Sequence, residues 1–135
     1  MKKWLLFIVF LLVGCTEQIH EPVRGQIEHP NIQDVLEIME PSEVALLAGE
    51  LASVSWEPNV EPEMERKQDV TLHLFISKDP NMPEYIITYR IWIENNQSLT
   101  LISTDENEGY GRMTSADAKE LVSFLQDKIG DEKSQ

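Results

Sequence analysis

Few residues of this chain have the types and spacing that catalysis requires. Its three histidines are His20, His29 and His73, and none belongs to an H-E-x-x-H or comparable metal-ligand spacing. The serines occur without a G-x-S-x-G elbow or an S-x-x-K pair. We therefore predict no catalytic residue. We interpret His73, in the middle of a predicted strand, as a hydrogen-bonded sheet residue rather than a ligand or a base.

Clustered carboxylates offer one weak candidate for a metal site. Asp105, Glu106 and Glu108 lie close together between two predicted strands, and hard cations such as Ca²⁺ bind through several clustered oxygens. The segment lacks the D-x-D-x-D-G spacing and the distant bidentate Glu of a calcium loop. We favour a solvated hairpin turn, keep Asp105 and Glu108 as the cation candidates, and expect no cofactor.

Aromatic residues are candidates to line a ligand groove. Trp92 shares a predicted strand face with Arg90, a pair that suits stacking or contact with an anionic group. Core and cross-strand packing is the interpretation that we favour for the aromatic residues as a set. Arg90 and Trp92 are the candidates for ligand binding. The full aromatic set is Trp56, Tyr85, Tyr89, Trp92 and Tyr110.

The single cysteine, Cys15, follows a segment with the layout of an export signal. Lys2 and Lys3 are positive, residues 4–13 are all apolar, and Gly14 precedes the cysteine. Ten apolar residues in a helix span about 15 Å, whereas a bilayer core is about 30 Å thick. The run is therefore too short to cross a membrane and has the length of a signal-peptide core.

This arrangement resembles the lipobox of bacterial lipoproteins. The resemblance implies that residues 1–14 are removed by cleavage between Gly14 and Cys15, and that Cys15 carries a diacylglycerol in thioether linkage. It also implies that this lipid holds the chain at the extracytoplasmic face of the cell membrane. The alternatives are a removed signal with an incidental cysteine and a free buried thiol.

The chain without residues 1–14 is strongly acidic. Nine Lys and Arg then stand against 24 Asp and Glu, a formal charge of −15. Such a surface repels nucleic acid and anionic lipid headgroups, so nucleic acid is not an expected partner. A basic partner or a divalent cation is the alternative to a merely soluble acidic surface. Since there is no second cysteine, no disulfide is expected within the chain.

Composition divides the mature chain into three parts. Residues 15–31 are predicted to be the lipidated cysteine and a flexible tether, with at most a short extended piece over 23–27. Sixteen flexible residues span on the order of 20 Å, which would hold an acidic domain clear of the membrane. Residues 32–130 are predicted to form a single domain, and 131–135 a disordered tail.

Hydrophobic periodicity predicts an α+β domain. One helix is expected from an N-cap at Ser42 to about Trp56, and a second from the capping box of Thr114 and Asp117 to Gly130. An antiparallel sheet of four to five strands with both helices packed on one face accommodates this order. Apolar alternation places the strands at 70–77, 85–94, 98–103 and 109–113, with a weaker one at 33–39.

Three segments together resemble small uncharacterised lipoproteins of Gram-positive bacteria. They are the helix running into SVSWEP (53–58), the YRIWI strand (89–93), and a Gly-Tyr-Gly strand before the last helix. The resemblance covers about residues 32–128. It implies a compact α+β domain in a Gram-positive envelope, and it carries over no activity and no functional residue.

These observations favour a membrane-anchored, non-enzymatic binding or interaction domain with an envelope protein as its partner. The alternative is an envelope enzyme or enzyme inhibitor with a site built from carboxylates and His73, and a third hypothesis is a simple spacer. A cleft where His73 and carboxylates converge would favour the enzyme, whereas an exposed apolar or aromatic patch would favour the binding domain. No oligomeric state is predicted.

Overall fold

Alternating apolar residues build the central strands. Along β4 (Val70–Ser77), β5 (Tyr85–Ile93) and β6 (Leu99–Ser103), alternate side chains are buried on one side of the sheet. Antiparallel ladders join the three strands, with Leu74 opposite Ile87 and Ile91 opposite Leu101. The structure is a computed structural model that describes residues 21–60 and 62–133.

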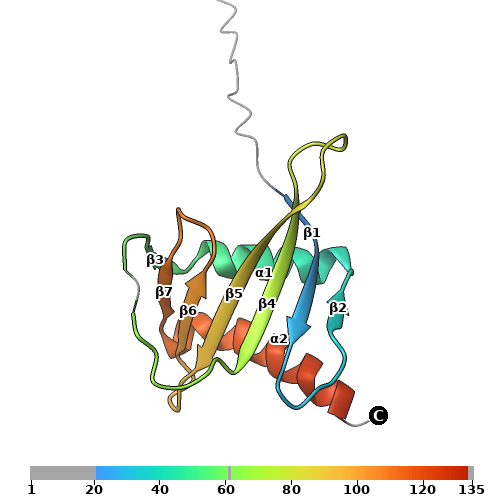
Figure 1. Ribbon diagram of the computed structural model, residues 1–135. Coiled ribbons are helices and arrows are strands. Elements are labelled where there is room, and N and C mark those ends of the chain that lie inside the picture. Colours follow the sequence, from blue (N-terminus) through green and yellow to red (C-terminus); the bar gives the residue numbers. More distant parts are fainter. Residues whose placement is uncertain (1–20, 61, 134–135) are drawn as a thin grey trace, which may run out of the picture.

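The sheet has seven antiparallel strands in the order β2-β1-β4-β5-β6-β7-β3 (Figure 1). The α+β class and the antiparallel sheet are confirmed, but the expected four to five strands is wrong. The other four strands are β1 (Glu21–Glu28), β2 (Leu36–Ile38), β3 (Ser55–Glu57) and β7 (Tyr110–Met113).

β1 is recognised from the sequence only as the short extended piece expected over 23–27, because it shows little apolar alternation. Its inward positions include Gly25 and Ile27, while the side chains that alternate with them, Arg24, Gln26 and Glu28, are polar or charged. A side chain at Gly25 would lie only 3.4 Å from Leu74 and 3.7 Å from Leu47, so this position is kept small by its neighbours. Residues 21–31, expected in the tether, therefore belong to the folded domain. Residues 15–20 lie outside the described part of the chain.

The first helix both begins and ends earlier in the sequence than expected. α1 (Pro41–Ala52) begins at Pro41, with Glu40 rather than Ser42 at the N-cap and no side-chain cap bond. Proline suits this first position because its fixed φ is helical and its missing N–H would be unpaired there anyway. Ser53 ends the helix, and the chain turns at once into β3, which pairs with β7.

The second helix, α2 (Ser115–Lys133), begins as predicted and ends later. Thr114 Oγ1 accepts a hydrogen bond from the N–H of Asp117 at 3.2 Å, which confirms Thr114 as the cap. Gly130 does not end the helix. The helix continues through this exposed glycine, which has no atom within 4 Å of where a Cβ would be. A glycine inside a helix costs about 1 kcal/mol relative to alanine, and α2 tolerates that loss. Residues 131–133 are therefore helical rather than a disordered tail, and 134–135 lie outside the described residues.

Both helices cover the same face of the sheet (Figure 1). They are joined by an ion pair between Glu43 of α1 and Lys128 of α2, at 2.6 Å. No helix within residues 21–60 and 62–133 covers the opposite side, which we call the open face. The helical side chains buried against the sheet are Val44, Leu47, Leu51, Ala118, Leu121, Val122, Leu125 and Ile129.

Candidate functional site

Strand register brings the polar residues of the open face into two neighbouring rows. One row crosses β5, β6, β7 and β3 as Trp92, Thr100, Arg112 and Ser55. The adjacent row runs Arg90, Ile102, Tyr110 and Glu57 across the same strands. Because side chains alternate between faces, residues two apart on a strand share a face. Arg90 and Arg112 therefore stand on the same side of the sheet, with β6 between their strands.

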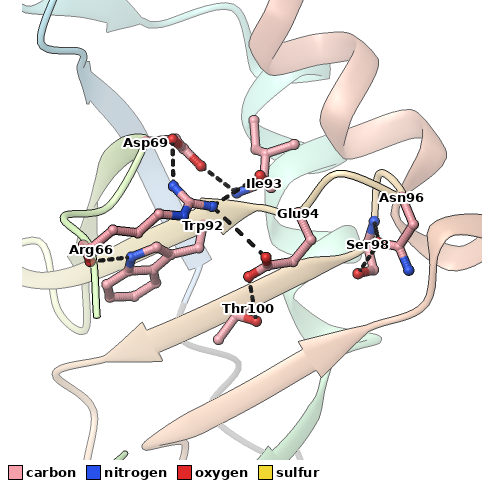
Figure 2. A network of polar contacts seen from close by, with 8 residues as sticks. All are labelled: Arg66, Asp69, Trp92, Ile93, Glu94, Asn96, Ser98 and Thr100. Carbon is pink, nitrogen blue, oxygen red and sulfur yellow. Dashed lines mark hydrogen bonds and ion pairs between the residues drawn. The ribbon is translucent and has the colours of Figure 1, made fainter. Parts of the chain in front are cut away.

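Trp92 and Arg90 lie together, as their spacing predicts, but only Arg90 is accessible. The Arg90 guanidinium lies 5.6 Å from the centre of the Trp92 ring. Residues 62–68, which we call the cover loop, lie against this pair. Trp92 is only 1 % exposed, and its indole N–H donates to the carbonyl of Arg66 at 2.8 Å (Figure 2). In this structure Trp92 offers no free ring face to a ligand.

A polar network fastens the cover loop to the sheet (Figure 2). Asp69 accepts two hydrogen bonds, one from Arg66 at 2.8 Å and one from the N–H of Ile93 at 2.6 Å. Arg66 also donates to the carbonyl of Ile93 at 3.1 Å and lies 3.9 Å from the Glu94 carboxylate. Sequence reasoning missed this network, because residues 57–67 have the composition of a solvated loop.

A shallow groove of about 960 Å³ opens beside the first row of the open face. It runs between the Asn95-Asn96 hairpin and the β7–β3 edge of the sheet. Its lining is rich in hydroxyl and amide groups, with one guanidinium and one carboxylate. The carboxylate, that of Glu94, already contacts Thr100 and Arg66, so the Arg112 guanidinium is the charged group left for a polar ligand that carries negative charge. The groups that matter for binding are those of Ser55, Asn96, Ser98, Thr100, Tyr110 and Arg112.

Two arginines of the open face, Arg90 and Arg112, are not paired with carboxylates. Within residues 21–60 and 62–133, neither Arg90 nor Arg112 forms an ion pair. Both side chains belong to exposed residues. In a chain whose formal charge is −13, cations without acidic partners stand out. Each leaves a guanidinium on this face that could pair with an anionic group of a ligand.

His73 is a hydrogen-bonded residue of the open face. Its Nδ1 lies 2.8 Å from Thr88 Oγ1, and its Nε2 lies 3.2 Å from the Glu28 carboxylate. The line from carboxylate to imidazole to hydroxyl has the order that activates a nucleophile. An oxyanion needs free N–H donors nearby, but the N–H of Thr88 already donates to Thr104 Oγ1 at 2.9 Å.

Asp105 and Glu108 hold the β6–β7 turn together. Glu108 Oε1 accepts hydrogen bonds from the hydroxyls of Tyr89 and Ser103, both at 2.8 Å. Asp105 Oδ1 accepts from the N–H of Asn107 at 2.8 Å. Burial raises the pKa of the Glu108 carboxyl and, more strongly, that of the Tyr89 hydroxyl. Across residues 21–60 and 62–133, no three His, Cys, Asp or Glu side chains are grouped as a metal site.

The five aromatic residues do not share one groove. Trp56 and Tyr89 pack on the helix side, with ring centres 5.9 Å apart, and the Trp56 indole N–H donates to the Leu51 carbonyl at 3.2 Å. Trp92 and Tyr110 belong to the open face instead. Packing on the two faces therefore accounts for most of the set, and Tyr110 is the one that lines the polar groove.

The anchor candidates Gly14 and Cys15, together with His20, lie outside the described residues. Among the helices that the structure describes, none combines the length and the apolar character needed to span a bilayer.

Comparisons with protein-family models, with curated proteins and with solved structures found no match to this chain.

Proposed function

We propose that this chain is an envelope lipoprotein of the kind found in Gram-positive bacteria, with lipid on Cys15 and its folded domain on the extracytoplasmic side of the cell membrane. The support is the order of two lysines, ten apolar residues, Gly14 and Cys15 at the start of the chain. Replacing Cys15 by Ser should release the protein from the membrane fraction. Retention of that variant in the membrane fraction would contradict lipid anchoring.

The folded domain, in this proposal, is a non-enzymatic binding domain. The observation that carries this function is the open face, where Arg112, which forms no ion pair with any residue that the structure describes, lines a groove of about 960 Å³ among hydroxyl and amide groups. Such a surface suits an acidic segment of an envelope partner, because the guanidinium pairs with carboxylates while hydroxyls and amides satisfy backbone groups. The strong negative charge elsewhere on the chain repels such a partner from other sites.

Site-specific crosslinking in the native envelope tests the binding surface. A photoreactive benzoylphenylalanine in place of Tyr110 should give discrete adducts, whereas the same residue in place of Lys119 on α2 should not. Arg112→Glu should reduce the adducts about tenfold, since losing a paired charge at an interface costs at least about 1.4 kcal/mol. Lys119→Glu is the matched control, because it makes the same charge change at an exposed residue of the helix side. Equal adducts from both positions would argue against the open face.

The line of Glu28, His73 and Thr88 favours an envelope hydrolase as the second candidate. This arrangement would make Thr88 a nucleophile with His73 as its base. A fluorophosphonate probe at pH 8 should then label Thr88, and His73→Ala should abolish the labelling. We rank this candidate second because the N–H of Thr88 is already engaged in the sheet.

A further inference from the structure

The chain enters the sheet at one particular end. The first residue of β1, Glu21, lies opposite Ser77, the last residue of β4. Only residues 16–20 separate Cys15 from Glu21, and six consecutive Cα–Cα steps reach at most about 20 Å. A lipid on Cys15 therefore keeps the β4 end of the sheet within about 20 Å of the membrane surface.

The β4–β5 hairpin is the part of the domain that projects furthest at this end. Its ladder continues to the pair Ile76 and Tyr85, whereas β6 pairs with β5 only from Tyr89 onward. Figure 1 shows the hairpin rising beyond the neighbouring strands on the side where β1 begins, well past the β6–β7 turn. A surface approaching this end meets the hairpin first.

Exposed apolar side chains gather at the same hairpin. Met82 at the turn is 60 % exposed, Ile86 on β5 is 51 % exposed, and Val23 at the adjacent bulge of β1 is 45 % exposed. They are three of the six large hydrophobic residues that the described chain exposes. An apolar side chain at the leading point of a tethered domain is suited to the boundary between headgroups and acyl chains.

Charges at the hairpin are balanced, unlike those of the chain as a whole. Arg24 pairs with Glu84 at 3.7 Å, and Lys78, which lies 4.9 Å from the Tyr85 ring, offsets Asp79 next to it. The formal charge of the entire chain is −13. Anionic headgroups therefore repel the hairpin less than they repel the rest of the domain.

We infer that residues 78–86, the tip of the β4–β5 hairpin, contact the lipid surface through Met82 and orient the anchored domain on it. This inference rests on the lipidation of Cys15 that is part of the proposed function. The contact needs little intrinsic affinity, because the anchor makes it intramolecular and raises the effective concentration of the tip at the surface.

The test uses the full lipidated chain in vesicles of phosphatidylcholine and phosphatidylglycerol at a ratio of 4:1, with and without lipids that carry a nitroxide near the headgroup. A fluorophore is attached at Asn81→Cys, next to Met82, because Cys15 is the only native cysteine and its thiol is blocked by lipid. The matched position is Asn95→Cys, in the hairpin at the other end of β5, about 30 Å away along the nine residues of that strand.

The nitroxide lipid should remove most of the emission at position 81 and little of that at position 95. Met82→Glu in the Asn81→Cys chain should restore the emission toward the level seen at position 95. Vesicle flotation tests separately whether the lipid on Cys15 anchors the chain to the vesicles. A chain that floats with equal quenching at both positions, or with quenching at position 81 that Met82→Glu leaves unchanged, overturns the apolar contact while the anchor stands. A chain that does not float overturns both.

Discussion

Replacing Asp69 by Ala should raise the population of a state in which the cover loop is locally open, without unfolding the domain. The carboxylate of Asp69 receives the N–H of Ile93 and the guanidinium of Arg66, and it is 35 % exposed. A hydrogen bond to a charged acceptor contributes about 1.5–3 kcal/mol, and a solvent-exposed ion pair contributes at most about 1 kcal/mol. Together the two contributions span about 1.5–4 kcal/mol, and since water reaches this carboxylate we take a loss of about 2 kcal/mol, near the lower end.

That loss should appear at the indole of Trp92, which the loop covers. A change of about 2 kcal/mol raises the population of a locally open state about 30-fold, since 1.4 kcal/mol is tenfold. Hydrogen exchange of the Trp92 indole N–H, which donates to the Arg66 carbonyl, should accelerate by this factor in an NMR measurement. The Trp56 indole N–H donates to the Leu51 carbonyl on the other side of the sheet and serves as the internal control.

The two indole signals separate local from global effects. Asp69→Ala should accelerate exchange at Trp92 and leave Trp56 unchanged. Asp127→Ala, an exposed substitution on α2, should change neither. Equal acceleration at both indoles would mean that the whole domain is destabilised, and no acceleration at Trp92 would mean that Asp69 does not hold the loop. Either result would refute the role that we assign to this network.

Three further predictions concern stability. In Gly111→Ala, the new Cβ would lie 2.5 Å from a Val54 methyl and 2.6 Å from the Trp56 ring; overpacking of this kind should cost about 1–3 kcal/mol in urea denaturation. A Gly111→Ala variant as stable as the parent would contradict this close packing. At Gly49 in α1 no atom lies within 4 Å of the position of a Cβ, so Gly49→Ala should instead stabilise the domain by up to about 1 kcal/mol. Burial raises the pKa of Glu108 above 4.5, so the stability that its protonated form contributes is present below pH 4.5 and lost as the pH rises through the native pKa. Glu108→Gln keeps an oxygen that accepts from both hydroxyls but cannot ionise. The free energy of unfolding of this variant, relative to that of the parent, should therefore increase as the pH rises to 7. Parallel stability curves for the two proteins would contradict the pKa shift.

Sequence patterns predict the elements whose stabilisation is local or strongly periodic. β4 and β5 follow from apolar alternation, and the start of α2 follows from the Thr114 cap. β1 follows only as a short extended piece over 23–27, because Gly25 replaces an apolar residue where Leu47 and Leu74 approach, and only the assembled sheet reveals that contact. A three-residue edge strand such as β3 likewise has too few positions to show a period.

Side-chain partners across long sequence separations are the part of the site that the sequence does not predict. The shared face of Arg90 and Trp92 follows from their spacing, but the burial of Trp92 depends on Arg66, 26 residues earlier. Glu28 and His73 meet only because β1 pairs with β4. The sequence around Glu108 is typical of a solvated turn. Its partly buried hydrogen bonds with Tyr89 and Ser103 depend on the β5–β6 register, which places those two residues opposite each other.

The position of β1 changes what an anchor on Cys15 would do to the binding surface. With the sheet beginning at Glu21, a lipid on Cys15 brings the β4–β5 end of the domain close to the bilayer instead of leaving the domain free on a long tether. The groove beside Arg112 lies next to the Asn95-Asn96 hairpin, at the opposite end of β5. Nine residues of strand separate these ends by about 30 Å. An anchored domain standing on its β4–β5 hairpin would therefore present the groove outward, where an envelope protein rather than a lipid headgroup can reach Arg112.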